Sequence, residues 1–542
     1  MRLLAVLGFL ATLTTACSDS PNEAPERDDD RDPSVAPRDD GGAADGARGA
    51  ADGAAQNAEP GGKTPAQLPP AEIRFRSCNG GFECGKLTVA RDYADPAAGT
   101  IELGVMRYRA RGQRIGALLI NPGGPGGSAI GFLPGFAAVA SSLGQRFDLV
   151  AFDPRGVGQS TPINCHDTLQ AYVAADPTPD DAAEWRAVDD ASKRFADDCA
   201  EKHRGLLPHL GTPNVARDMD RVREALGEET ISYLGYSYGT AIGAWYAALF
   251  PKRVRAMVLD GAVDMDLSAV DLALEQGRGF EDALESYFAW CTSGLFRCAW
   301  TGGQTPAMAF ARLTAQADRA PLRANGADRP AGPGEFTLGV IATLYGGEAG
   351  WQTLSTTLEA AAAGEGTQLV RLSDGYLDRR DDGSYSNVVE TNNAVNCLDK
   401  PTPDAAALEA ELPRFQREAP LFGAATLTGL LVCSHWPATQ SETKLPPPAG
   451  APPIVVIGTT GDPATPYAWA GALAEQVGTG VLLTYEGEGH TAYGRGVPCV
   501  EAAVNAYFIN GTVPAAGTRC RDSLFSEVRD EPLLLRFSPG GR

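Results

Sequence analysis

A serine set between two glycines, where one apolar run ends and another begins, constrains the fold of this chain more than any other feature. Ser237 lies between Gly235 and Gly239, with the run Ile231–Leu234 before them and residues 241–250 behind. A strand that turns directly into a helix needs glycines at such positions, because a Cβ atom would hold the two elements apart. Since G-x-S-x-G also arises by chance, a surface turn is the competing interpretation, and the rest of the chain has to decide.

The apolar runs on both sides of this turn follow the rhythm of a parallel sheet. They span Gly116–Ile120, Phe147–Phe152, Ile231–Leu234 and Val254–Leu259. Continuous apolar strands that alternate with helices indicate a parallel sheet covered on both faces. The rhythm stops over residues 265–445, where the period is mostly helical, and resumes at Ile454–Ile457. A helical insertion is therefore predicted to interrupt one sheet.

An aspartate and a histidine each follow one of the late apolar runs. Asp462 lies in G-T-T-G-D-P-A-T-P, and His490 lies in E-G-E-G-H after the run 480–485. The other four histidines, at positions 166, 203, 209 and 435, precede the serine or fall inside the insertion. The chain order Ser, Asp, His is that of the α/β-hydrolases. The predicted fold class is thus α/β, an α/β-hydrolase fold with a mostly parallel central sheet and a large helical lid insertion.

A glycine-rich loop completes the predicted catalytic site. Residues 121–127, N-P-G-G-P-G-G, follow the run that begins at Gly116. Glycines allow backbone N–H groups to point at a developing oxyanion, and we assign the donors to Tyr238 and Gly124. In the predicted mechanism, His490 takes the hydroxyl proton of Ser237 as that oxygen attacks a carbonyl, while Asp462 holds the imidazole tautomer. Water then hydrolyses the acyl-enzyme.

Taken together, the motifs resemble those of a known family. N-P-G-G-P-G-G-S, F-D-P-R-G-V-G-Q-S, G-Y-S-Y-G-T, G-D-P-A-T-P and G-E-G-H look like those of the exported tripeptidyl aminopeptidases of actinobacteria, which belong with the prolyl aminopeptidase α/β-hydrolases and include mycobacterial cell-envelope lipoprotein proteases. The resemblance covers about residues 72–525. It implies a serine exopeptidase that releases short peptides, typically tripeptides, from a free N-terminus. Prolyl aminopeptidases carry His-Gly-Gly-Pro-Gly where this chain has Pro122–Gly126, which keeps the oxyanion glycine.

An exopeptidase of this kind must recognise a charged amine, which the resemblance implies is done by carboxylates in the lid. The candidates are Glu390 in N-V-V-E-T-N-N and Asp399 in A-V-N-C-L-D, and the second resembles a family motif around a cysteine. A solvated or capping acid is the alternative for each. The expected partners are peptides or proteins with a free N-terminus. A net charge of −22 argues against nucleic acid, and the oligomeric state stays open.

The N-terminal residues predict export. Residues 1–17 combine one positive charge, a short apolar core and small residues before Cys17, too short a stretch to span a bilayer. Leu13-Thr-Thr-Ala-Cys17 resembles a bacterial lipoprotein processing site, with the leucine one position further from the cysteine than usual. Lipidation of Cys17 would tether the protein to the membrane of the cell envelope. An ordinary secretory signal, which would leave the protein freely secreted, is the alternative.

Four regions follow from these patterns. They are an export signal over 1–17, an acidic Ala/Gly/Pro linker over 18–70 too poor in apolar residues to fold, a core over 71–264 and 446–530, and a mainly helical lid over 265–445. Besides Cys17 there are ten cysteines, and neighbours in sequence suggest the pairs 78–84, 165–199, 291–298, 397–433 and 499–520, although sequence alone does not fix the connectivity. Disulfides belong in an oxidising compartment. With no C-x-x-C and no H-E-x-x-H, neither a metal nor a cofactor is expected.

Two other functions remain open at this level. A carboxylesterase or lipase would use the same Ser237–Asp462–His490 triad, although the lipase motif H-G-G-G is missing. A non-catalytic envelope-binding lipoprotein on a hydrolase scaffold would have no need of all three groups. Haloalkane dehalogenases and epoxide hydrolases share the fold but need an aspartate at the elbow, so Ser237 excludes them.

Overall fold

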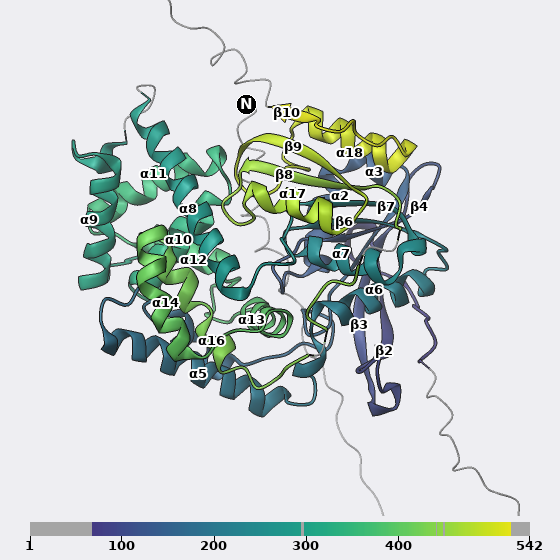
Figure 1. Cartoon of the computed structure of the whole chain (residues 1–542), viewed down its shortest axis with the longest axis horizontal. Coiled ribbons are helices and arrows are strands. Elements are labelled where there is room, and N and C mark those ends of the chain that lie inside the picture. The colour runs from purple at the N-terminus through teal and green to yellow at the C-terminus, as the bar shows by residue number, and fades with distance from the viewer. Residues whose placement is uncertain (1–67, 294–297, 441, 448–449, 522–542) are drawn as a thin grey trace, which may run out of the picture.

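A computed structural model describes residues 68–293, 298–440, 442–447 and 450–521 (Figure 1). The predicted export signal, Cys17 and the predicted linker up to residue 67 lie outside these ranges, as do residues 522–530 of the predicted core. No helix in the described ranges has the length and apolarity that crossing a membrane requires.

The described residues build one sheet of ten strands around which the molecule is arranged. The strands are β1 (Arg76–Ser77), β2 (Glu83–Ala90), β3 (Thr100–Tyr108), β4 (Gly116–Asn121), β5 (Phe147–Phe152), β6 (Ile231–Tyr236), β7 (Val254–Asp260), β8 (Ile454–Gly461), β9 (Gly480–Glu488) and β10 (Arg519–Arg521). Their spatial order is β1-β2-β3-β5-β4-β6-β7-β8-β9-β10. The pairs from β1 to β5 are antiparallel, and every pair from β5 to β10 is parallel. The fold is that of an α/β-hydrolase.

Helices cover both faces of this sheet, which explains the unbroken apolar runs of its central strands. Every residue of β4, β5 and β6 is buried. One face packs against α6 (Thr212–Ala225), α7 (Gly239–Leu249) and α17 (Tyr467–Gln476). The other packs against α2 (Ala129–Val139), α3 (Ser141–Gly144) and α18 (Pro498–Asn510). A parallel strand buried on both sides has no polar face, so alternation is absent from its sequence.

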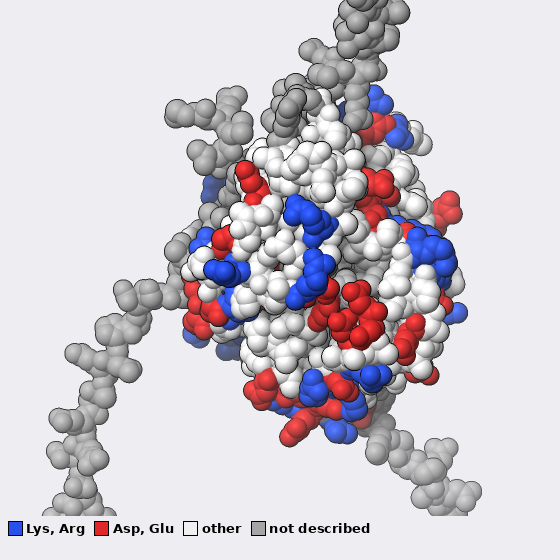
Figure 2. All heavy atoms as spheres, turned by 90° about the vertical axis from the view of Figure 1, so that its left-hand side faces the viewer, with Lys and Arg blue, Asp and Glu red and all other residues white. Residues whose placement is uncertain are grey.

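A helical cover stands beside the sheet and comes from two segments of the chain (Figure 1). Between β7 and β8 it contains α8 (Ala269–Thr292), α9 (Pro306–Arg319), α10 (Pro333–Leu344), α11 (Glu348–Ala362), α12 (Thr367–Tyr376), α13 (Val388–Asp399), α14 (Ala405–Glu418), α15 (Gly423–Thr428) and α16 (Leu431–Ser434). Two helices from the predicted core segment, α4 (His166–Val173) and α5 (Ala182–His203), share an apolar cluster with α13 and α16. Figure 2 faces this cover and shows acidic and basic side chains on the same surface.

Five disulfides join cysteines that are neighbours in sequence, the pairing that the sequence order suggests. They are Cys78–Cys84, Cys165–Cys199, Cys291–Cys298, Cys397–Cys433 and Cys499–Cys520. Two of them brace the cover, because one joins the start of α4 to α5 and another joins α13 to α16. Disulfides on this scale are compatible with export. The described residues contain no group of three or more His, Cys, Asp or Glu side chains placed to hold a metal ion.

A fully buried ion pair holds the loop after β5 to α6. The guanidinium of Arg155 binds both carboxylate oxygens of Asp218 at 2.7 Å, and neither side chain is exposed. Arg155 also donates to the carbonyls of Ala90, Arg91 and His209, so its donors are matched by acceptors. A buried charge left without its partner is strongly destabilising, whereas the intact pair is close to neutral.

We therefore expect Arg155→Met to lower the free energy of unfolding by about 3–5 kcal/mol, because Asp218 would stay buried and unpaired. The matched control is Arg217→Met, which removes a pair with the half-exposed Glu442 and should change stability by less than about 1 kcal/mol. Denaturant unfolding of both variants measures the difference. Equal losses would contradict this account of the Arg155 pair.

Candidate active site

Ser237 occupies a strained turn between β6 and α7. Its φ is +54°, a left-handed conformation that non-glycine residues rarely adopt. Both flanking glycines are needed, because a Cβ on Gly235 would collide with the carbonyl of Gly239, and one on Gly239 would lie 2.9 Å from the carbonyl oxygen of Asn121. The Ser237 N–H donates to the carbonyl of Asp260 at 2.8 Å. The side chain stays partly exposed, which is what a nucleophile at a strand-to-helix turn requires.

Asp462 and His490, far apart in sequence, are in direct contact. Asp462 follows β8, His490 follows β9, and the imidazole Nδ1 lies 2.9 and 3.0 Å from the two carboxylate oxygens. Asp462 is buried and also accepts the N–H groups of Ala464 and Thr465, so its orientation is fixed. With Nδ1 turned to the carboxylate, Nε2 faces away from it, and within the described residues Nε2 has no hydrogen-bond partner. This orientation leaves Nε2 able to act as a base.

The turn of Ser237 and the loop of His490 meet at the end of β7. Asp260, the last residue of that strand, binds the N–H of Ser237 through its carbonyl. A Cβ on the next residue, Gly261, would lie 3.1 Å from Cε1 of His490 and 2.8 Å from Cγ2 of Thr491. Asp260 and Gly261 thus lie between the turn of Ser237 and the imidazole of His490. A hydrogen bond between catalytic groups is often long until the substrate binds.

Two further residues support His490, and neither belongs to the catalytic residues predicted from the sequence. The Thr465 hydroxyl donates to Asp462 Oδ2 at 2.9 Å and lies 3.3 Å from His490 Nδ1. Tyr345, from the turn between α10 and α11, accepts the N–H of His490 on its carbonyl at 2.9 Å, and its ring stands edge-on to the imidazole at 5.2 Å. Thr465 follows Asp462 by three residues, a local signal that was available. Tyr345 comes from the cover, and no local pattern marks it.

The glycine loop after β4 packs directly against the serine turn. Gly123 and Gly124 have φ of +91° and +114°. A Cβ on Gly123 would lie 2.9 Å from Cβ of Ser237 and 3.0 Å from the backbone nitrogen of Tyr238, so only glycine fits there. The two segments that carry the predicted oxyanion donors, Gly124 and Tyr238, are therefore in contact.

Helix α13 of the cover is seated on this same loop. Asn392 donates from Nδ2 to the carbonyl of Pro125 at 3.1 Å. A Cβ on Gly126 would collide with the Thr391 hydroxyl and would lie 2.6 Å from the carbonyl oxygen of Val388. The cover thus has contacts with the candidate site on two sides, through α13 at the oxyanion loop and through Tyr345 at His490.

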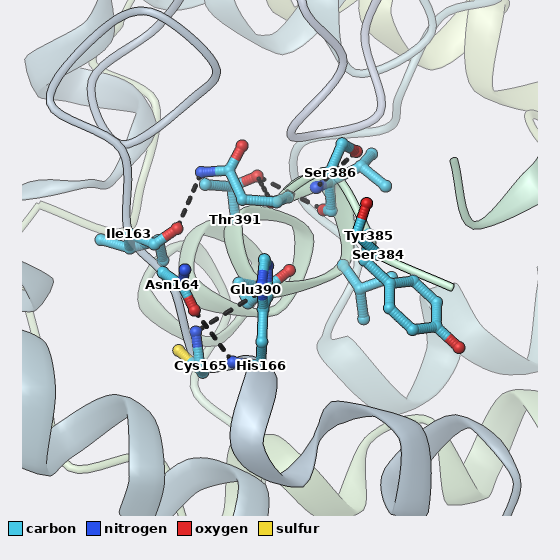
Figure 3. A network of polar contacts seen from close by, with 12 residues as sticks. Ile163, Asn164, Cys165, His166, Ser384, Tyr385, Ser386, Glu390 and Thr391 are labelled. Atoms are coloured by element: carbon cyan, nitrogen blue, oxygen red, sulfur yellow. Dashed lines mark hydrogen bonds and ion pairs between the residues drawn. The ribbon is translucent and has the colours of Figure 1, made fainter. Parts of the chain in front are cut away.

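The two carboxylates predicted to bind an amine lie in different surroundings. Glu390 is fully buried, accepts the N–H of Cys165 at 3.4 Å and lies 2.9 Å from Nε2 of His166 (Figure 3). Burial raises the pKa of Glu390 to about 7 and lowers the pKa of His166, so neither group is strongly held in its charged form. Glu390 therefore faces α4 and not open solvent.

Asp399, at the other end of α13, is partly exposed. It accepts the N–H of Thr212 and the amide of Gln440, each at 2.9 Å, as well as the Thr212 hydroxyl. Desolvation of its carboxylate outweighs these hydrogen bonds and raises the pKa of Asp399 to about 6. Since the Thr212 hydroxyl also contacts the Tyr238 hydroxyl, Asp399 is one side chain away from the residue that follows Ser237.

Comparison with known proteins gives two family matches and several relatives. Residues 419–520 match the family model of TAP-like proteins, and residues 116–298 match that of the α/β hydrolase fold. The serine protease Hip1 of Mycobacterium tuberculosis is 39% identical over 464 residues, covering 81% of this chain and 88% of the relative. A protein of the same organism named carboxylesterase B is 39% identical over 454 residues, covering 81% and 86%. The tripeptidyl aminopeptidase of Streptomyces lividans is 33% identical over 457 residues, covering 81% and 83%.

The seating of α13 on the glycine loop generates a direct test. We expect Gly126→Ala to slow the labelling of Ser237 by a fluorophosphonate about tenfold or more, because the new Cβ would displace the loop that carries the predicted oxyanion donor Gly124. Gly131→Ala, in α2 a few residues further on, is the matched control, since its Cβ would meet only Ser128 at 3.4 Å or more. Wild-type labelling of the Gly126 variant would show that the loop position does not matter.

Proposed function

Because this chain belongs to the TAP-like α/β-hydrolases, we propose that it is a serine hydrolase of a particular kind: an exopeptidase that cleaves peptide bonds near a free N-terminus and releases short peptides, tripeptides foremost. The observation that carries the proposal is the contact of His490 with Asp462 beside the strained turn of Ser237. The names of two relatives, a serine protease and a tripeptidyl aminopeptidase, support a peptide substrate.

The reaction would proceed through an acyl-enzyme. Ser237 Oγ attacks the scissile carbonyl carbon and His490 Nε2 takes the hydroxyl proton, while Asp462 keeps the other proton on Nδ1 and stabilises the imidazolium. The C–N bond then breaks, and His490 returns the proton to the leaving amine. Water attacks the ester in the same way, with His490 again as the base, and releases the short peptide. The N–H groups of Tyr238 and Gly124 would stabilise the oxyanion in both steps.

We assign recognition of the substrate ammonium to the cover, and to Asp399 in preference to Glu390. Partial exposure and a position near Tyr238 support Asp399, whereas the enclosure of Glu390 beside His166 argues against direct contact with substrate. An ionised carboxylate pairs with an ammonium through a charge-assisted hydrogen bond, which is stronger than a neutral one.

A carboxylesterase is the second candidate, and the relative of that name is the observation in its favour. The same triad cleaves esters and amides, so the fold does not separate the two. The free amine of the substrate separates the two functions, because only the exopeptidase needs it.

We expect a tripeptide anilide with a free N-terminus to be cleaved about 10–100-fold more efficiently than its acetylated form, since acetylation removes one charged hydrogen bond. Ser237→Ala should lower kcat about 10⁴-fold or more on either substrate. Steady-state kinetics on the pair measures both effects. Equal rates on the two anilides, with faster cleavage of simple esters, would favour the carboxylesterase.

Asp399→Asn tests the amine site separately from the triad. The variant should raise KM for the free-amine anilide about tenfold, through loss of a charged hydrogen bond, and should leave a blocked ester unaffected. Since the pKa of Asp399 is about 6, KM of the wild type for the free amine should also rise as the pH falls through that value, because the protonated carboxyl is neutral and does not pair with an ammonium. The asparagine variant should lack this rise.

Glu390→Gln is the comparison variant, and its KM should stay near that of the wild type. A loss at Asp399→Asn that is equal on both substrates would reject the amine role.

A further inference from the structure

A second buried carboxylate stands beside the Asp462–His490 pair. Asp260 ends β7, which lies in the sheet between β6 and β8, the strands that lead to Ser237 and to Asp462. Its side chain is 0% exposed. Its carbonyl accepts the N–H of Ser237 at 2.8 Å, and the N–H of the next residue, Gly261, binds the carbonyl of Ile457 in β8 at 3.1 Å. The main chain at this point therefore joins the nucleophile turn to the neighbouring strand.

The Asp260 side chain binds the loop that carries the imidazole. Its oxygens accept the N–H of Ala492 at 3.1 Å each, and Oδ2 also accepts the N–H of Tyr493 at 2.7 Å. Asp462 holds the preceding part of the loop through Nδ1 of His490 and the N–H of Thr491 at 3.2 Å. Two carboxylates from adjacent strands thus share residues 490–493 between them.

The loop needs both anchors because it contains a strained residue. Thr491 has φ of +65°, a region that a β-branched side chain strongly disfavours. Such a conformation persists only where the surroundings over-determine it. One carboxylate holds the N–H of Thr491 itself and the other holds the two N–H groups that follow. Without the second anchor, the loop would relax toward negative φ and carry the adjacent imidazole with it.

We propose that Asp260 is a positioning residue for catalysis. Its main chain fixes Ser237 and its carboxylate fixes the His490 loop, so that the serine hydroxyl and the imidazole are held in position for proton transfer. The inference rests on His490 as the base of the proposed reaction. It does not depend on the peptide specificity of that reaction. Asp260 touches no reacting atom and acts through residues 237 and 490.

The charge of Asp260 makes this role dependent on pH. Burial raises its pKa to about 7, against the lowering effect of the two N–H donors and of His490. The titratable groups that face it are Asp462, His490 and the Tyr236 hydroxyl. Because the folded-state pKa lies above the ordinary 3.8, stability falls as the pH rises from about 4 to about 7, where the unfolded chain has lost this proton and the folded chain still keeps it. Ionisation in the folded protein, near pH 7, makes both carboxylate oxygens charged acceptors for the N–H groups of the loop.

Asp260→Asn is the primary test, because the amide removes the charge and one acceptor, and its NH₂ group, placed at the Oδ1 position, faces the N–H of Ala492. We expect kcat on a simple ester, and the rate of fluorophosphonate labelling, to fall about 100-fold while KM stays within about threefold, as for a misplaced catalytic group. Asp148→Asn is the matched control. Asp148 is also buried and accepts the N–H of Ala110 at 2.9 Å, but it lies at the amino end of β5. The Asp148→Asn variant should lose about as much thermal stability as Asp260→Asn and keep the wild-type kcat.

Two further measurements separate positioning from folding. The acidic limb of kcat should be steeper in the wild type than in Asp260→Asn, since protonation of Asp260 weakens the anchor of the loop in the wild type and has no counterpart in the variant. Thr491→Gly, which accepts a positive φ without strain, should restore part of the kcat of the Asp260 variant when the two are combined. This gain would not follow from a purely structural defect.

His490→Ala distinguishes a failure of this inference from a failure of the proposed function. If it leaves labelling of Ser237 unchanged, the proposed catalytic assignment is wrong. If it abolishes labelling while folded Asp260→Asn retains wild-type kcat, or while Asp260→Asn and Asp148→Asn lose kcat equally, the positioning role of Asp260 is overturned.

Discussion

Parallel pairing of β6, β7, β8 and β9 is the constraint on which the candidate site depends. Strands that run in one direction end at one edge of the sheet, and their register sets which residues stand side by side there. Tyr236 pairs with Asp260, Asp260 with Ile457, and Ile457 with Leu483. A serine, a carboxylate and an imidazole from distant parts of the chain then emerge within a few residues of that line. Open parallel sheets bind their ligands at this edge, because the loops that follow the strands meet there.

Local sequence patterns predict the sheet and the pair Asp462 and His490, which are in contact. Strands buried on both faces leave unbroken apolar runs, and a strand-to-helix turn leaves its two glycines. Position after a late strand also singled out His490 among five histidines. The structure engages others elsewhere, His435 with Asp189 and His203 with the backbone of Asn164. Neither contact involves Ser237, Asp462 or His490.

Contacts between segments distant in the chain leave no such pattern, so residues that act through them are not predictable from the sequence. In the sequence, Asp260 is only the last residue of a strand. Its carboxylate contacts the loop after His490 in the folded chain alone. Tyr345 is one aromatic residue among many in a helical region. Helices α4 and α5 have the polar composition of a surface segment because only one side of each is buried, and their partner lies some two hundred residues further on. Glu390 and Asp399 look equivalent in sequence, and burial alone separates them.

The division of the cover between two chain segments has a consequence for how the protein folds. Helices α4 and α5 precede β6, whereas α13 and α16, which share their apolar cluster, follow β7. In order from the N-terminus, the first pair has its apolar side uncovered until β6 and most of the later helices are in place. Such non-local pairing slows folding and exposes surface that favours aggregation. The Cys165–Cys199 bond closes within the early pair. Oxidation before the partner arrives would keep the two helices together and narrow the search for their final contact.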